Sequence, residues 1–249
     1  MRLYYVNLNR LKRNCLWGAL FLLLGLLFTL VILQQPATTV TTSHSRIVYK
    51  VRTQEKVAAL TFDISWGDKT VGPVLDTLKK ENVKCTFFLS GPWAVKHPDI
   101  PKRIAADGHE IASHGYRHEN YSQMSDKTIA EEIGKTHEIL KDLTGQSPKL
   151  IRTPNGDWNE RVLDAIAGTG YTAVQWSVDS LDWKRTGAEA MRERILRLIH
   201  PGAVILMHAS DSAEHTPEAL PMVIKGLKEK GYKLVTVSEL LKYGRGVAE

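Results

Sequence analysis

Two histidines four residues apart, His114 and His118, are the first candidates for chemistry in this sequence. Imidazole nitrogen is a common ligand of zinc and other transition metals, and this spacing lets both rings reach one ion. An unaccompanied histidine pair in a turn is more often a polar surface feature. Because carboxylates and other polar groups follow several apolar runs elsewhere in the chain, the sequence favours a metal site with His114 and His118 as ligands and zinc as the expected ion.

Further polar side chains stand directly after apolar runs, where strands are expected to end. They are Asp63 after residues 57–62, Arg152 at the end of 150–152, Asp179, Asp182 and Trp183 after 172–176, and His208 after 203–207. Carboxylates and imidazoles move protons, and a guanidinium holds anions. Each one alone has an ordinary interpretation, such as a salt bridge or a satisfied core histidine. Their recurrence after successive runs predicts a shared site.

Short apolar runs alternate with stretches of helical spacing from about Ile47 onward. The remaining runs are residues 86–89, 110–113 and 233–235, and a typical helical stripe is Val71, Val74, Leu75 and Leu78. About seven strands separated by helices predict a parallel sheet. We therefore expect an α/β fold, a single distorted (β/α) barrel of about seven parallel strands, whose reactive groups gather at the C-terminal ends of the strands. An open doubly wound sheet is the alternative, but no glycine-rich phosphate loop follows the first run.

Five short motifs contain these candidates in order along the chain. They are residues 61–63, 113–118, 152–156, 179–183 and 206–208. Together they resemble the ordered motifs of the polysaccharide deacetylase family, a carbohydrate esterase type with the NodB-homology domain, over about residues 56–241. Each motif alone is weak, whereas five in order are specific. Within the family, residues 64–66 and the short anchored chain resemble a membrane-anchored branch associated with sporulation in Bacillus-type bacteria.

The resemblance implies a metal-dependent enzyme that hydrolyses N-acetyl groups of amino sugars in cell-wall polysaccharide, with peptidoglycan as the expected substrate. It implies a divalent metal ion, zinc by default, on His114 and His118. Asp63 is implied as the catalytic base that takes a proton from metal-bound water, and His208 as the general acid that protonates the departing amine.

Further roles follow from the same resemblance. Arg152 is implied to brace the base, and Asp179 or Asp182 to orient either Arg152 or His208; we place Asp182 in the catalytic group, although the sequence does not assign the partner. Trp183 and Leu206 are expected to line the slot for the acetyl methyl, with ordinary core packing as the alternative. The backbone amide of Asn155 is expected to donate to the tetrahedral oxyanion.

One position departs from the family pattern. The family has two adjacent aspartates in the first motif, the second of which binds the metal, and this chain has Ile64 there. Isoleucine cannot be a ligand. Asp68 is five residues past Asp63 and has two alternative roles, as a replacement ligand or as the cap of the helix expected from about Thr70. The sequence leaves both open, and the departure also raises the hypothesis of a protein that binds glycan without turning it over.

The N-terminal segment predicts a membrane anchor. Residues 16–33 are an uncharged apolar run long enough to cross most of a bilayer core, and four basic residues without an acidic one precede it. We expect a cytoplasmic N-terminus at 1–15, a transmembrane signal anchor at 16–33, a stalk or linker at 34–50, and a deacetylase domain at 51–249. The protein is then a single-pass protein of the cytoplasmic membrane with its catalytic domain outside the cytoplasm. A cleaved signal peptide is the alternative.

The charge distribution limits the classes of partner that we expect, and the cysteine positions bear on disulfide formation. The formal net charge is +6 at pH 7, but four of the positive charges precede the apolar run and no basic block follows it, so nucleic acid is not an expected partner. Cys15 and Cys85 fall on opposite sides of the expected anchor, so no internal disulfide is expected. The expected partners are cell-wall glycan and the membrane.

Three functions compete at this point. The first is the N-deacetylase, and the second is a catalytically weak or inactive glycan-binding or morphogenetic protein on the same fold. The third is a barrel glycoside hydrolase, which needs a pair of carboxylates; Asp179 and Asp182 are the only candidates for such a pair.

Overall fold

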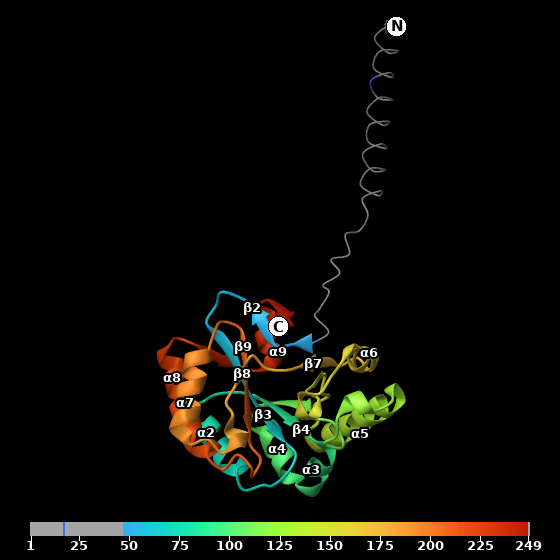
Figure 1. Cartoon of the computed structure of the whole chain (residues 1–249), viewed down its shortest axis with the longest axis horizontal. Coiled ribbons are helices and arrows are strands. Elements are labelled where there is room, and N and C mark those ends of the chain that lie inside the picture. The colour runs from blue at the N-terminus through green and yellow to red at the C-terminus, as the bar shows by residue number, and fades with distance from the viewer. Residues whose placement is uncertain (1–16, 18–46, 249) are drawn as a thin grey trace, which may run out of the picture. The chain divides into compact units, whose positions relative to one another are not determined.

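Strand β3 (Val57–Ile64) lies at the centre of the sheet of this computed structural model and is buried along its whole length. Parallel neighbours extend from it in the order β7-β6-β5-β4-β3-β9-β8. The other strands of this set are β4 (Thr86–Leu89), β5 (Glu110–Ser113), β6 (Leu150–Ile151), β7 (Thr172–Val174), β8 (Val178–Asp179) and β9 (Ala203–His208). They form a nearly closed α/β barrel (Figure 1). The predicted seven-stranded barrel is confirmed over the open doubly wound sheet.

The membership of the barrel differs from the prediction at one strand. Residues 233–235 form β10, which pairs with residues 57–59 of β3, whereas β4 pairs with residues 61–64 of β3. The two strands therefore follow one another along the same side of β3. The strand that extends the sheet beyond β9 is β8, which was not predicted because two residues carry no periodic pattern.

The structure describes residue 17 and residues 47–248. Strand β1 (Ile47–Val48) pairs with β7, and β2 (Lys50–Arg52) pairs antiparallel with β9 and with β11 (Arg245–Val247). Both begin inside the stretch predicted as linker, because Ile47 and Val48 are buried against the sheet. In the described part of the chain no helix is long and apolar enough to cross a membrane. The predicted cytoplasmic segment at 1–15, almost all of the anchor at 16–33 and the linker up to residue 46 lie outside the described residues.

Helices connect and cover the strands, with α7 and α8 on one flank of the barrel and α5 and α6 on the other (Figure 1). Their bounds are α2 (Val71–Lys80), α3 (Gly91–Lys96), α4 (Asp99–Ala106), α5 (Asp126–Thr144), α6 (Glu160–Gly168), α7 (Ala188–Leu198), α8 (Thr216–Glu229) and α9 (Val237–Leu240). The predicted stripe of α2 is its buried face. Helix α7 packs through Met191 and Ile195, whereas Leu198 at its end is 37% exposed.

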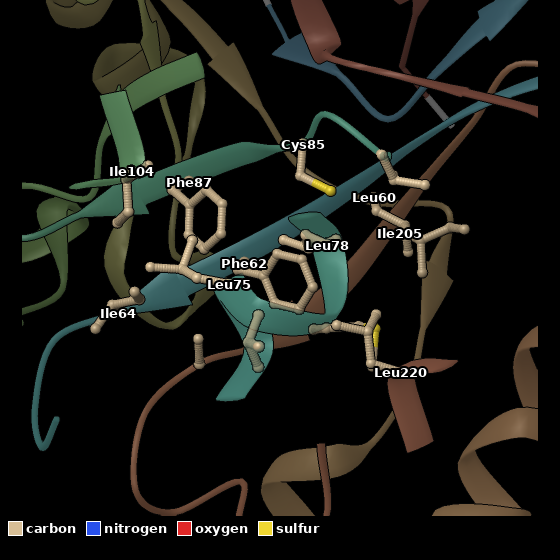
Figure 2. Close-up of a cluster of buried hydrophobic side chains, with 14 of the residues drawn as sticks. Leu60, Phe62, Ile64, Leu75, Leu78, Cys85, Phe87, Ile104, Ile205 and Leu220 are labelled. Atoms are coloured by element: carbon tan, nitrogen blue, oxygen red, sulfur yellow. The ribbon is translucent and has the colours of Figure 1, made fainter. Parts of the chain in front are cut away.

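The two faces of β3 pack differently because successive side chains of a strand point to opposite sides. Leu60, Phe62 and Ile64 face the helices and join a large apolar cluster with Leu75 and others (Figure 2). The residues between them, such as Ala59, face the barrel interior, where a second apolar cluster forms. Asp63 belongs to the interior series, so the strand itself directs its carboxylate to the barrel mouth.

Candidate active site

Asp63 and His208 are aligned on neighbouring strands at the C-terminal ends of β3 and β9. The register of the parallel ladder pairs Phe62 with Met207 and Asp63 with His208. The backbone N–H of Ala209 also donates to the carbonyl oxygen of Asp63 at 3.2 Å. The two polar side chains are therefore held side by side by the sheet, as expected for barrel sites.

Arg152 is the partner of Asp63. Its side chain is 0% exposed, and its Nη1 lies 2.6 Å from Oδ1 of Asp63 and 3.0 Å from Oγ1 of Thr61. The guanidinium also donates to two backbone carbonyls and lies over the Phe88 ring, 4.1 Å from its centroid. Burial alone would raise the pKa of Asp63, but the guanidinium and two nearby imidazoles hold it below its ordinary value. Asp63 is thus an ionised, oriented carboxylate.

Asp182 is the partner of His208, which settles by geometry the assignment that the sequence left open. Its Oδ1 lies 2.7 Å from Nδ1 of His208, and its Oδ2 accepts from the backbone N–H of His208 at 2.7 Å and from Oγ1 of Thr216 at 2.9 Å. Burial disfavours the charged imidazole, but the hydrogen bond and charge of Asp182 outweigh it, so the pKa of His208 is raised. The carboxylate of Asp179 instead accepts from the backbone N–H of Leu181.

His114 and His118 lie at the same mouth, in the loop that follows β5, with ring centroids 5.3 Å apart. Nδ1 of His114 is 2.7 Å from the backbone carbonyl of Arg152, so it carries the proton and leaves the lone pair of Nε2, which lies 3.8 Å from Oδ2 of Asp63. Burial lowers the pKa of His114 to about 4 and lowers that of the half-exposed His118 as well. Both rings are therefore neutral at pH 7, as a metal ligand must be.

Within residues 47–248 no third protein ligand joins this pair. Ile64 is 0% exposed and packs in the apolar cluster on the far face of β3. Asp68 takes neither of its two predicted roles: its carboxylate lies 3.5 Å from Nδ1 of His97 and is largely exposed, while Asp211 accepts from the backbone N–H groups ahead of α2. Among the described residues no group of three or more His, Cys, Asp or Glu side chains could hold a metal ion. Two imidazoles fit a metal in part only, because a catalytic zinc site normally has three protein ligands.

The side chains described above surround a cavity of about 460 Å³ at the barrel mouth. It is lined by Asp63, Ser65, Trp66, His114, His118, Asn155, Gly156, Trp176, Asp179, Trp183, Leu206, His208, Ser210 and Ser212. A cavity of this size accommodates one sugar unit with its acetyl group. Of the two carboxylates predicted as the pair of a glycoside hydrolase, Asp179 lines the cavity, whereas Asp182 is buried behind His208. The predicted pair therefore does not reach the cavity together; the second carboxylate that lines it is Asp63.

The three predicted substrate contacts all reach the cavity. Leu206 is 3% exposed and faces it from β9, whereas Trp183 is 48% exposed and lies on the short 3₁₀ turn Asp182–Lys184. Leu181 and Arg185 flank this turn with φ values of 58° and 54°, a conformation that costs free energy for residues other than glycine. Asn155 also has a φ of 58°, and its side chain donates to Asn120 at 2.8 Å.

Two tryptophans of the cavity were not singled out by the sequence. Trp66 is 46% exposed and lies edge-on to the His118 ring, with centroids 5.3 Å apart. Trp176 follows β7 and packs against Gly156, where a Cβ atom would lie 2.8 Å from the indole ring. Trp66 follows the predicted strand 57–62, whereas Trp176 is the last residue of the predicted strand 172–176. A rule that selected polar residues directly after each strand therefore reached neither tryptophan.

The comparison with protein families decides the identity of this site. A family model described as polysaccharide deacetylase matches residues 50–174, half of the chain. The chain belongs to the polysaccharide deacetylase family. The predicted family is therefore confirmed.

The relatives of this chain include both an uncharacterized protein and a named deacetylase. The uncharacterized protein YlxY of Bacillus subtilis (strain 168) is 37% identical over 194 residues, which are 78% of this chain and 60% of YlxY. A peptidoglycan-N-acetylglucosamine deacetylase of Bacillus cereus is 40% identical over 186 residues, 74% of this chain and 68% of that protein. The chain thus spans less than two thirds of YlxY and about two thirds of the B. cereus deacetylase.

A solved structure adds a caution about activity within the family. BA3943 of Bacillus anthracis, described as a CE4 family pseudoenzyme, superposes with a TM-score of 0.75 at 34% identity, over 80% of this chain and 70% of that chain. A mutant of BA3943 is described as having restored enzymatic activity, with the same TM-score at 35% identity, over 80% of this chain and 72% of that chain. The fold is thus present both in a named deacetylase and in a named pseudoenzyme, so activity has to be argued from the site.

Proposed function

We propose that this protein removes N-acetyl groups from the amino sugars of cell-wall peptidoglycan. The observation that carries the proposal is the pairing of an ionised carboxylate, Asp63, with an imidazole of raised pKa, His208, on adjacent strands at one cavity. Amide hydrolysis needs a base for the attacking water and an acid for the departing amine. The names of the peptidoglycan deacetylases among the relatives support the choice of substrate.

Asp63 acts as the base in this proposal. Arg152 holds one carboxylate oxygen, which leaves Oδ2 to accept a proton from water beside the acetyl carbonyl. A carboxylate whose pKa is held low is a weak base, so its contribution comes chiefly from position. Arg152 is a positioning residue, because its side chain is fully buried behind Asp63.

His208 acts as the acid. Asp182 binds Nδ1, which fixes the ring and leaves Nε2 to carry the proton that is donated to the amine nitrogen as the C–N bond breaks. The raised pKa of His208 favours the protonated imidazole, which is the form that supplies a proton to the leaving group. Leu206 and Trp183 border the space for the acetyl methyl.

The metal dependence implied by the family has partial support. His114 and His118 are neutral imidazoles at the cavity, and His114 is oriented by a backbone carbonyl as metal-bound histidines commonly are. The third donor is missing, so we route no step through a metal ion. We propose that zinc binds this pair weakly and that water or substrate oxygens complete its coordination.

Acetate release tests the proposed activity. The full chain in detergent should release acetate from peptidoglycan glycan strands, and Asp63→Asn and His208→Ala should each lower the rate about 100-fold or more. Zinc content of the wild type and of His114→Ala, measured before and after zinc addition, tests the metal site. Equal background rates for the wild type and both variants on every glycan would refute the proposed activity.

A second function is favoured by the position of Ile64. A protein that keeps the cavity and its tryptophans but lacks the third ligand is suited to bind glycan without hydrolysing it, and BA3943 is a precedent for an inactive relative. Binding of glycan by the wild type without acetate release, with or without added zinc, would support this alternative.

The proposed substrate fits the expected location. The apolar run at 16–33, with basic residues before it, supports a membrane-anchored protein whose domain faces the cell wall. Protease accessibility of the domain in intact cells tests this topology. A role in sporulation rests on the resemblance of residues 64–66 and stays a prediction.

A further inference from the structure

A second pocket lies next to the active-site cavity. It has a volume of about 290 Å³ and shares four lining residues with the cavity, Asn155, Gly156, Trp176 and Asp179. Because the two hollows share these residues, they lie next to each other. A glycan whose reacting sugar occupies the cavity can therefore extend toward the second pocket.

The walls of the second pocket contain both aromatic and polar side chains. Tyr49 and Trp176 contribute aromatic rings, and Leu198 contributes an exposed apolar side chain. The hydroxyl of Ser177 is buried at this pocket and has no hydrogen-bond partner in the described part of the chain. Buried polar groups in native proteins almost always have a partner, so we expect the Ser177 hydroxyl to turn toward a ligand or water in this pocket. Aromatic rings beside a hydroxyl without a partner suit a pyranose ring.

Arg194 adds a positive charge to this wall. It comes from α7, and its Nε donates to the backbone carbonyl of Asp179 at 2.8 Å, which fixes the guanidinium over the pocket. Within residues 47–248 no ion pair engages its two terminal amino groups. The carboxylate of Asp179 lines the same pocket but accepts from the backbone N–H of Leu181. A planar guanidinium with two available donors matches a carboxylate.

We propose that this pocket binds the sugar next to the one being deacetylated, and that Arg194 binds the carboxylate of an acidic substituent on that sugar. The proposal rests on the proposed glycan substrate and narrows it. Where the stem peptides have been removed, peptidoglycan strands alternate a neutral N-acetylamino sugar with one that bears a free lactyl carboxylate, whereas chitin-type glycans carry no carboxylate. Arg194 thereby selects an alternating acidic glycan and sets which sugar occupies the cavity.

Binding affinity for two tetrasaccharides of equal length tests the proposal. The full chain in detergent is titrated by calorimetry with a peptide-free peptidoglycan tetrasaccharide and with chitotetraose, for the wild type, Arg194→Met and Ser177→Ala. Loss of a charge-assisted hydrogen bond should raise the Kd of Arg194→Met for the acidic tetrasaccharide about tenfold or more. The Kd for chitotetraose should stay within about twofold of the wild-type value, and Ser177→Ala should weaken both ligands alike.

The matched control is Arg197→Met, which removes an exposed arginine of the same helix that does not line the pocket. It should leave both affinities unchanged. Equal weakening of both tetrasaccharides by Arg194→Met, no weakening of either, or no measurable binding of the acidic tetrasaccharide to the wild type at millimolar concentration would each overturn the assignment.

Acetate release recorded on the same samples separates this inference from the proposed activity. Selective loss of affinity in Arg194→Met without acetate release from the wild type would keep the pocket and refute the hydrolase. Acetate release from both glycans with no selective effect of Arg194→Met would keep the hydrolase and refute the pocket.

Discussion

The site has two halves: the proposed proton-transfer half, Asp63 and His208, and the proposed metal-binding half, His114 and His118. The two halves differ in how completely the fold supports their side chains. In the first half, each reactive group has a buried partner: Arg152 for Asp63, and Asp182 for His208. In the second half, His114 is oriented by a backbone carbonyl, but the position that supplies the family's third ligand is occupied by Ile64 in the apolar layer. The proposed proton-transfer residues thus both have buried partners, whereas the proposed cation site beside them is incomplete.

This difference indicates that residues of one half can be substituted without disrupting the other half. A buried ion pair is hard to change one partner at a time, because the remaining charge is left without compensation. A carboxylate at the end of a strand can be replaced by an apolar residue at little cost when the strand end packs against a core. Four substitutions test this difference.

The largest effect is expected for Arg152→Met, which leaves the Asp63 carboxylate buried and unpaired. The free energy of unfolding should fall by about 3–5 kcal/mol at pH 7. Because the pKa of Asp63 is lowered in the folded state, its pairing stabilises the wild type above the unfolded value of about 3.9 and is lost as pH falls through the folded pKa. The difference between the two proteins should therefore shrink in acid, as measured by urea unfolding.

The control for Arg152→Met is Arg161→Met, which breaks the exposed ion pair with Asp126. An exposed pair contributes about 0–1 kcal/mol. A similar loss in both variants would show that burial does not distinguish the two pairs.

Next in size is Ile64→Asp, which restores the family residue. Because the side chain lies in the apolar cluster (Figure 2), the metal-free variant should lose about 2–4 kcal/mol in the free energy of unfolding, against about 0.5–1.5 kcal/mol for Ile64→Val. Zinc should recover stability in Ile64→Asp only if the strand end turns toward His114. Unchanged stability without zinc would contradict the buried position.

A smaller effect is expected for Asp182→Asn. Loss of the charged partner of His208 should lower acetate release roughly 10- to 100-fold. The raised pKa of His208 should also fall, because only the charge of Asp63 then opposes the effect of burial, so the alkaline limb of the pH–rate profile should move to lower pH. Thr216→Val removes one hydrogen bond to the same carboxylate and should move the limb less. A limb that stays in place in both variants would remove His208 as the acid.

The smallest effect concerns the loop between the two histidines. Glu132 of α5 is buried and accepts from the backbone N–H of Arg117 at 2.7 Å and from its Nε at 2.9 Å. Glu132→Gln should lower the free energy of unfolding by about 1–2 kcal/mol. The exposed neighbour Glu131 provides the control, since Glu131→Gln should change it by no more than about 0.5 kcal/mol. Equal effects would mean that α5 does not hold this loop.

Much of the barrel could be predicted from the sequence, because its strands and helices carry clear periodic patterns. Residues 86–89 and 110–113 became strands with the predicted bounds, and the stripe of α2 is its buried face. Strands β1 and β8 were missed because two-residue strands depend on tertiary pairing. The same limit explains why the boundary between linker and domain was placed too late.

The site was predictable as a set of residues and unpredictable in its pairings. Motif order placed Asp63, His114 and His208 at one barrel mouth, but no pattern assigned Asp182 rather than Asp179 to His208. The fate of Asp68 was likewise open, because Asp211 lies far along the chain and reaches the start of α2 only through the fold. Spacing along the chain does not encode such contacts between distant loops.

The ladder register between β3 and β9 has a consequence for how this scaffold can diversify. Neighbouring strands lie about 4.8 Å apart, and residues 63 and 208 are direct partners in that ladder. The backbone separation between the proposed proton acceptor and the proposed proton donor is therefore fixed by the sheet and insensitive to insertions in the surrounding loops. Exchange of the surrounding loops can therefore change the substrate, while the distance between the two residues proposed to act on either end of the amide bond stays the same.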